Sequence, residues 1–175
     1  MWKGFSIFKS QVDVNNRQIK MEDERVAFES AKVTDIYVLQ TILKKVYGKS
    51  PWSNTIFWIE LTKKQNGLYL KVLDRNKTVG FVGVRVEGSD AHITNIAVLP
   101  DCQNQGFGKQ LLEQAEKFAL SKDCLTLSLE VKKSNVQAIT LYKKFGFFEN
   151  GVKPKYYKED EEDAIDMVYV LEEIK

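Results

Sequence analysis

The most informative segment of this chain is Asn95–Leu112, NIAVLPDCQNQGFGKQLL. An apolar strand ends at Pro100, and an amphipathic helix begins around Gly106 and Gly108. The two glycines let the backbone turn sharply and approach a ligand closely, and the N–H groups at the helix start suit an anion such as a pyrophosphate. Lys109 in the first turn is unfavourable for the helix dipole, which is mild support for a bound anion. On the glycines alone, an ordinary strand-to-helix turn is an equally good interpretation.

Hydrophobic periodicity on both sides of this stretch predicts a mixed α/β domain in which helices cover a sheet. We expect strands over Arg25–Ala31, Leu68–Leu73, Val79–Val86, His92–Val98, Cys124–Val131 and two terminal pieces around Phe147 and Ile165–Leu171. We expect helices that begin at Thr34–Asp35, at Pro51–Trp52–Ser53, at the glycine turn and at a capping box formed by Ser134 and Gln137. Gly48 and Gly146 suit the ends of the first and the last helix. This order is not a regular βαβ repeat.

Length and composition indicate one globular domain. The chain has 175 residues, of which 43% are apolar and 29% charged, and it contains no repeat and no linker rich in Pro, Gly or Ser. Residues 1–24 are polar and weakly patterned, so we expect a loosely ordered N-terminal extension before a single domain over residues 25–175. The apolar stretches are too short to cross a bilayer and the N-terminus lacks a signal-peptide pattern, so we expect no membrane association.

Charge and residue usage exclude several classes of function. A formal net charge of +2 provides no broad basic field, so we expect no direct binding of nucleic acid. Cys102, Cys124 and His92 are too few for a usual zinc site, and two cysteines make no secreted disulfide framework. We therefore expect reduced thiols, no metal and a cytoplasmic location. The glycine turn lacks the Gly-Lys-Ser/Thr ending of a P-loop and the spacing of a dinucleotide fingerprint, which disfavours a nucleotide-binding regulatory domain.

Two blocks of sequence resemble the GNAT acetyltransferases. Gln103-x-x-Gly106-x-Gly108, after the strand Ile96-Ala97-Val98, is similar to the family's loop for the pyrophosphate of coenzyme A. The second block, Leu129-Glu130-Val131, Ser134-Asn135 and Ala138–Phe147, looks like the family's C-terminal signature. Three shorter segments, Pro51-Trp52-Ser53, Tyr156-Tyr157 and Glu162–Ile165, resemble the RimI-type ribosomal-protein-alanine N-acetyltransferases. The likeness covers roughly Ala27–Leu171 and leaves out the first two dozen residues.

The resemblance implies the GNAT fold, a twisted mixed sheet of about six or seven strands flanked by about four helices. It implies acetyl-CoA as the cofactor, with coenzyme A as product. The binding residues that it implies are Ile96, Ala97, Val98, Gln103, Asn104, Gln105, Gly106, Phe107, Gly108, Lys109 and Asn135.

Two residues are the candidates for acid–base catalysis. Glu130 lies with Thr126 and Ser128 on the strand face opposite the leucines, and the resemblance makes it the general base, acting through a water. Without the resemblance, a solvated glutamate at a strand end is the better interpretation. Tyr142 lies on the apolar face of its helix, where the resemblance makes it the general acid and the alternative is a core tyrosine. His92 has no partner visible in the sequence and is interpreted as a half-buried structural histidine.

The RimI-type resemblance implies direct transfer of the acetyl group to a protein N-terminus, with the N-terminal alanine of a small-subunit ribosomal protein as the acceptor. Trp52 and Tyr156 are the candidate walls of the acceptor pocket, and the acidic run Glu159–Asp163 could meet a basic substrate or form a solvated loop. Two alternatives stay open: a GNAT enzyme that acetylates a small polyamine or an aminoglycoside, and a non-catalytic module that binds acetyl-CoA. We expect a monomer or a weak dimer.

Overall fold

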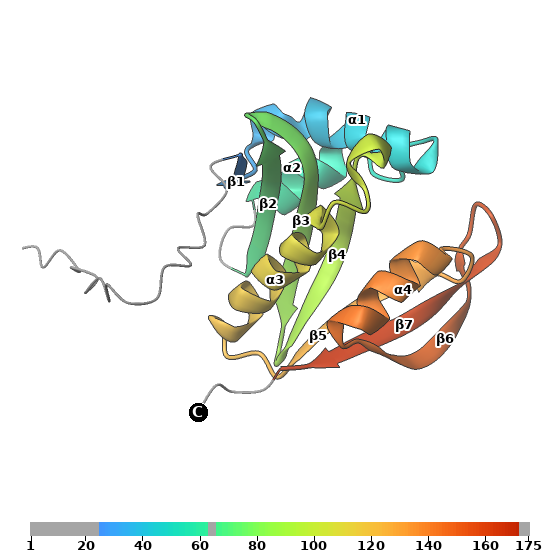
Figure 1. The fold of residues 1–175 in the computed structure, drawn as a ribbon. Coiled ribbons are helices and arrows are strands. Elements are labelled where there is room, and N and C mark those ends of the chain that lie inside the picture. The colour runs from blue at the N-terminus through green and yellow to red at the C-terminus, as the bar shows by residue number, and fades with distance from the viewer. Residues whose placement is uncertain (1–24, 63–65, 172–175) are drawn as a thin grey trace, which may run out of the picture.

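Seven strands of the described residues form one mixed sheet, and four α-helices cover it. The computed structural model describes residues 25–62 and 66–171, and Figure 1 shows how they are arranged. The strands are β1 (Val26–Ser30), β2 (Gly67–Asp74), β3 (Lys77–Glu87), β4 (Asp90–Val98), β5 (Thr126–Lys132), β6 (Phe148–Tyr157) and β7 (Glu162–Val170). The helices are α1 (Ile36–Tyr47), α2 (Asn54–Thr62), α3 (Phe107–Leu120) and α4 (Val136–Phe145). Across the sheet the order is β1-β2-β3-β4-β5-β7-β6, so the expected mixed α/β architecture is confirmed.

Successive side chains of each strand point to opposite faces of the sheet, so apolar residues form one core on each face. On one face, α3 and α4 pack on strand residues such as Val82 and Leu127. On the other face, α1 and α2 cover a cluster of rings that contains Phe57, Tyr69 and Phe81. Because Phe81 and Val82 are neighbours in β3, their side chains enter opposite cores, and each face of the sheet is buried independently.

The sheet opens between β4 and β5, its only parallel pair among the described strands. The two strands pair over just three positions, Asp90–His92 with Thr126–Ser128. Beyond His92, β4 continues to Val98 along β3, and β5 continues to Lys132 along β7. The two halves of the sheet therefore diverge, and past His92 the edge of β4 that faces β5 pairs with no strand of the described residues.

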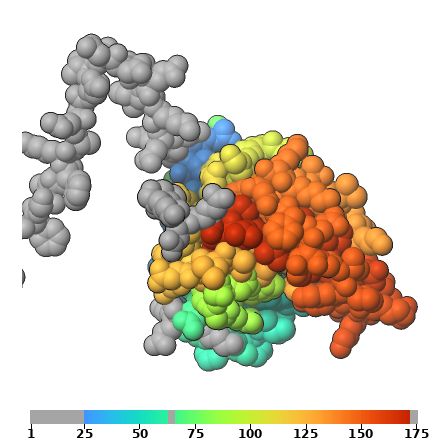
Figure 2. Space-filling model, turned by 90° about the horizontal axis from the view of Figure 1, so that it is seen from below, coloured from blue at the N-terminus to red at the C-terminus, as the bar shows by residue number. Residues whose placement is uncertain are grey.

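The divergence separates the C-terminal part of the chain from the rest. Segments from α4 to β7, orange and red in Figure 2, project to one side of the molecule as a lobe of their own. They remain attached because β5 pairs with β7 over its whole length and α4 contacts α3. The opening between the halves is where a ligand can reach the interior of the sheet.

Most of the predicted elements are confirmed, and two local predictions are wrong. The N-cap of α4 is Asn135 rather than Ser134, because the Asn135 side chain accepts the N–H of Ala138 at 3.2 Å, whereas the Ser134 N–H donates to Glu162 at 2.8 Å. Alternation along the strand expected over Cys124–Val131 places Leu125 on the same face as Leu127, but β5 begins at Thr126, and Leu125 precedes it and is 59% exposed. Neither correction moves a helix or a strand by more than its end.

The predicted extension over residues 1–24 lies outside the described residues. In the part of the chain that the structure describes, no helix is both long and apolar enough to span a membrane.

Candidate active site

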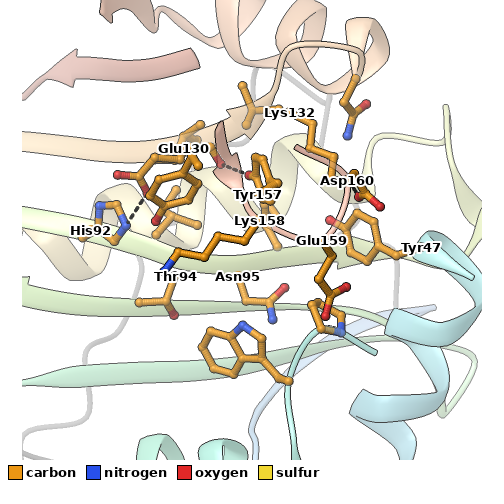
Figure 3. Close-up of a pocket in the computed structure, with 18 of the residues that line it drawn as sticks. Tyr47, His92, Thr94, Asn95, Glu130, Lys132, Tyr157, Lys158, Glu159 and Asp160 are labelled. Carbon is orange, nitrogen blue, oxygen red and sulfur yellow. Dashed lines mark hydrogen bonds and ion pairs between the residues drawn. The ribbon is translucent and has the colours of Figure 1, made fainter. Parts of the chain in front are cut away.

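A cavity of about 660 Å³ lies where β4 and β5 part. Its walls include His92–Ile96 of β4, Leu129–Lys132 of β5, the segment Tyr156–Asp160 at the end of β6 and in the turn that follows, and Trp52 before α2. Figure 3 shows that the labelled side chains of all three strand segments point into the same space. The cavity therefore joins residues that are far apart in the sequence.

Glu130 is held at the centre of a charged network. Its side chain is only 11% exposed, and its Oε2 atom lies 3.0 Å from Nε2 of His92. Its Oε1 atom forms an ion pair with Lys153 of β6, and the Tyr157 hydroxyl donates to the Glu130 carbonyl at 3.4 Å. The hydrogen bond from His92 and the ion pair with Lys153 lower the pKa of Glu130 to about 2, although burial opposes this. Glu130 is thus a carboxylate with both oxygens engaged, which by itself is a weak base.

His92 is half-buried, as the sequence suggested, but it has partners that the sequence did not reveal. Its Nδ1 atom lies 2.9 Å from Oγ of Ser128, which in turn donates to Oδ2 of Asp90 at 2.5 Å. The hydrogen bond to Glu130 raises the pKa of His92 above its ordinary value. Asp90, His92, Ser128 and Lys153 are functional candidates that sequence reasoning missed. A partial signal was present, because polar residues recur with period two at Asp90 and His92 and at Ser128 and Glu130, but the pairing of the two strands is visible only in the structure.

Tyr142 lies on the same cavity and is buried, with 6% of its surface exposed. Its ring packs against that of Phe147 at 5.8 Å between centroids. Burial raises the pKa of its phenol, so the hydroxyl stays protonated at neutral pH. A protonated, desolvated phenol at the wall of a cavity can donate a proton to a leaving group, as well as pack in the core.

The glycine turn before α3 is held in place by hydrogen bonds of its own side chains. The Gln103 amide donates to the carbonyl of Val98 at 3.0 Å, and the Gln105 amide donates to the carbonyl of Asp101 at 3.0 Å. Gln137 of α4 donates to Gln103 at 3.3 Å and to Asn104 at 3.4 Å, which ties the turn to the second motif block. The two motif blocks are therefore adjacent in the fold.

Gly106 and Gly108 have different structural roles. Gly106 is the N-cap of α3 with φ of 88°, in the region that favours glycine, and it has no side chain to cap the first N–H groups of the helix. Those N–H groups are open to an anion. At Gly108, an added Cβ would lie 2.9 Å from Cδ2 of Leu141, so this glycine allows α3 to approach α4. Lys109 forms an i,i+4 ion pair with Glu113 at 3.4 Å, which accounts for its place in the first turn without a ligand.

The remaining predicted binding residues divide between the cavity and the core. Ile96 and Asn135 line the cavity, whereas Ala97, Val98 and Phe107 are buried in the apolar cores. Only the backbone of Ala97 and Val98 is available to a ligand, along the β4 edge that has lost its strand partner.

The two predicted acceptor residues both line the cavity. Trp52 packs on Phe57 and Tyr69 with centroid distances of 5.4 and 6.4 Å, so its ring is held by the core behind it. Tyr156 is half-exposed, stands edge-on to Tyr157 at 5.2 Å, and has the Lys153 ammonium 5.7 Å from its ring centre. The two side chains are positioned as walls of one pocket.

The acidic run is largely neutralised by the protein's own lysines. Glu159 forms an ion pair with Lys49, Asp160 with Lys132, and Glu161 with Lys155 at 3.7 Å. The run therefore does not present a free negative surface, and its carboxylates order the β6–β7 turn beside the cavity.

Comparison with known proteins identifies the family. The model of the acetyltransferase (GNAT) family matches residues 31–147, which is more than half of the chain. The chain belongs to the GNAT acetyltransferase family. A Bacillus subtilis protein that carries the provisional name ribosomal protein bS18-alanine N-acetyltransferase is 37% identical over 124 residues, which cover 71% of this chain and 82% of that protein.

Two solved GNAT structures extend the comparison. The ribosomal-protein-S18-alanine N-acetyltransferase of Escherichia coli superposes with a TM-score of 0.76 at 31% identity, over 86% of this chain and 96% of that one. A provisionally named streptothricin acetyltransferase of Bacillus anthracis, solved with acetyl-CoA, superposes with a TM-score of 0.59 at 28% identity, over 63% of this chain and 65% of that one. The protein is thus an acetyl-CoA-dependent N-acetyltransferase with the GNAT fold, as the motifs predicted.

The geometry of this GNAT enzyme fits acetyl-CoA. The uncapped start of α3 at Gly106 suits the pyrophosphate, and the open edge of β4 supplies backbone donors and acceptors between that helix and Glu130. When bound, acetyl-CoA supplies the acetyl group as a reactive thioester. The chain itself supplies a buried carboxylate, a buried phenol and an aromatic pocket on one cavity.

Proposed function

We propose that this enzyme acetylates the N-terminal α-amino group of a protein, with the N-terminal alanine of the small-subunit ribosomal protein bS18 as its acceptor. The observation that carries the proposal is the likeness to the Bacillus subtilis and Escherichia coli proteins named for that reaction, which extends over 71% and 86% of this chain. The likeness is not confined to the cofactor motifs, because the aligned region of the Escherichia coli structure covers 96% of that enzyme.

The electrostatics of the cavity favour an α-amine over a polycation. A polyamine site needs carboxylates that are not already neutralised, but Glu130 and the acidic run are paired with lysines of the same chain. Lys132 and Lys158 also line the cavity and would repel a polycation. An α-amino group has a pKa of about 7.7–8.0, so an appreciable fraction is neutral near neutral pH and needs only a modest base.

In the proposed reaction, the residues of the chain have separate tasks. Trp52 and Tyr156 confine a small first side chain, so that its amine lies near Glu130. Glu130 takes the proton from the amine, directly or through a water, and the Tyr142 hydroxyl gives a proton to the departing sulfur. The backbone N–H groups at Gly106–Lys109 and along β4, together with Asn135, hold the cofactor.

A peptide panel tests the acceptor. The protein is incubated with acetyl-CoA and with peptides that begin with alanine, with a bulky residue such as leucine, or with a blocked amine followed by several free lysines, and spermidine is included as a small amine. We expect mass spectrometry to show a single acetyl group on the α-amine of the alanine peptide. Preferential acetylation of lysine side chains or of spermidine would contradict the proposal and favour the alternative acceptors.

A cytoplasmic location and a monomeric or weakly dimeric state stay predictions, consistent with an acceptor on the ribosome.

A further inference from the structure

The single histidine of the chain lies in a row of hydrogen-bonding groups that ends at Glu130. The row runs from Asp90 to Ser128 at 2.5 Å, from Ser128 to Nδ1 of His92 at 2.9 Å, and from Nε2 of His92 to Glu130 at 3.0 Å. Thr126 donates to the second oxygen of Asp90 at 2.6 Å, which holds that carboxylate in place. Figure 3 shows His92 at the cavity wall, directed toward Glu130.

Counting hydrogens along the row determines the tautomer of His92. A serine hydroxyl has one hydrogen, and Ser128 gives it to Asp90, because a carboxylate can only accept. Ser128 must therefore accept from Nδ1 of His92, so Nδ1 carries a hydrogen in every protonation state. Nε2 is left as the nitrogen that gains and loses a proton, and it faces Glu130.

Nε2 of His92 and Oε2 of Glu130 lie at a distance at which they can share one proton. Without it, two lone pairs would face each other at 3.0 Å; with it, an imidazolium and a carboxylate form a charge-assisted hydrogen bond. Once Nε2 carries the proton, both oxygens of Glu130 are engaged, by His92 and by Lys153. The competent base is therefore the pair in which Nε2 is free.

We propose that His92 is a positioning residue that receives, through Glu130, the proton lost by the acceptor amine, and that Ser128 and Asp90 direct this proton to Nε2. The inference rests on the proposed role of Glu130 in acetyl transfer. As the C–N bond forms and the C–S bond breaks, one proton leaves the amine nitrogen for Glu130 and passes to Nε2, and one leaves Tyr142 for the sulfur. The pair then releases its proton to solvent, and Tyr142 regains one.

The charged groups near the His92 ring support its role as a proton acceptor. The hydrogen bond with Glu130 raises the pKa of His92, against the effect of burial, so the ring is a stronger proton acceptor than an ordinary imidazole. The charged groups that surround the ring come from four strands: Arg85 and Glu87 of β3, Asp90 of β4, Glu130 of β5 and Lys153 of β6. When Nε2 carries the proton, the hydrogen bond from His92 and the ion pair with Lys153 hold the pKa of Glu130 at about 2, so Glu130 is then a far weaker acceptor.

The ring can be observed directly, because a tag-free protein contains one histidine. Long-range proton–nitrogen NMR spectra of the ¹⁵N-labelled protein, recorded across a pH series without acceptor, report both ring nitrogens. We expect a midpoint above the ordinary 6.5 and a neutral form with its hydrogen on Nδ1. Glu130→Gln should lower the midpoint. Ser128→Ala should allow the neutral ring to carry its hydrogen on either nitrogen, whereas Ser128→Thr, which keeps the hydroxyl, should leave it on Nδ1. A neutral form with its hydrogen on Nε2, or a midpoint that Glu130→Gln leaves unchanged, would overturn the inference.

Kinetics supply the second readout. We expect His92→Gln to lower kcat at pH 8 on the order of tenfold and to remove the rise of kcat that follows the NMR midpoint of the wild-type ring. Acetyl-CoA affinity should stay unchanged, measured by calorimetry. If kcat of His92→Gln keeps the wild-type pH dependence, His92 does not take the proton. The ring titration needs no acceptor, so a failure of the alanine assignment would be seen in the peptide panel and not in this test.

Discussion

Replacement of Glu130 by glutamine separates the charge of this residue from its shape. The Oε1 contact to Lys153 and the Oε2 contact to His92 are the causes of the low pKa, and an amide can reproduce the size of the group but not its charge. The fall of the pKa from 4.5 to about 2 corresponds to about 3 kcal/mol in favour of the charged form in the folded state. We therefore expect Glu130→Gln to lower the free energy of unfolding at pH 7 by up to about 3 kcal/mol.

The pH dependence of this loss has a definite sign. A carboxylate with a depressed pKa stabilises the fold fully above its unfolded value, and this contribution disappears as the pH falls from 4.5 toward 2. The stability difference between wild type and Glu130→Gln should therefore be largest at neutral pH and should shrink through that acid range. Urea unfolding, followed by circular dichroism at several pH values, measures it.

The same variant tests the catalytic role. With acetyl-CoA and acceptor both saturating at neutral pH, we expect kcat to fall on the order of 100-fold or more, with acetyl-CoA still bound in calorimetric titration. Glu149→Gln is the matched control, because Glu149 forms a half-exposed surface ion pair with Lys143 at 2.7 Å, worth about 0.2–1 kcal/mol. The control should keep the wild-type kcat. The reasoning is refuted if Glu130→Gln retains more than about one tenth of the wild-type kcat, a loss far smaller than removal of a general base causes.

Three further substitutions probe the acid, the cofactor loop and the core. Tyr142→Phe keeps the packing on Phe147 and should lower kcat on the order of 100-fold with unchanged acetyl-CoA affinity; a kcat close to wild type would exclude the phenol as the acid. Gly106→Ala and Gly88→Ala both place a side chain at positive φ, 88° and 64°, at a cost of roughly 1–2 kcal/mol, but calorimetry should show weaker acetyl-CoA binding only for the first. Phe81→Ala removes a fully buried ring that contacts Phe57 and Tyr69, so urea unfolding should show a loss of about 3–5 kcal/mol; a loss under about 1 kcal/mol would contradict the assignment of this core.

The sequence alone was sufficient for the fold class, the order of the elements and the family. Each of these depends on signals carried by short stretches: the alternation of apolar residues in the strands, the helical spacing after Gly106, and the glycine that the positive φ at the start of α3 favours. Gly48 likewise ends α1 with φ of 76°, a local requirement that is visible in the sequence.

The sequence also identified Glu130 and Tyr142 as catalytic candidates, but each had a purely structural alternative and nothing linked the two. Only the tertiary structure brought both to one cavity and surrounded Glu130 with His92 and Lys153. Lys153 is 23 residues from Glu130 along the chain, and His92 is 36 residues from Ser128. No local pattern reports such distances, since they follow from the register of β4 against β5 and of β5 against β7.

The electrostatic environment of the cavity also depends on the tertiary structure. In the sequence, Glu159–Asp163 is an acidic run, and Lys49 and Lys132 are distant basic residues; in the fold they are paired beside the cavity. An ion pair depends on distance and burial, which a sequence does not contain, so the low pKa of Glu130 and the raised pKa of His92 became visible only in three dimensions. The motifs were therefore sufficient to identify the family and its reaction. The packing of the strands determines which side chains surround Glu130 and His92, and so it determines the protonation of these two residues.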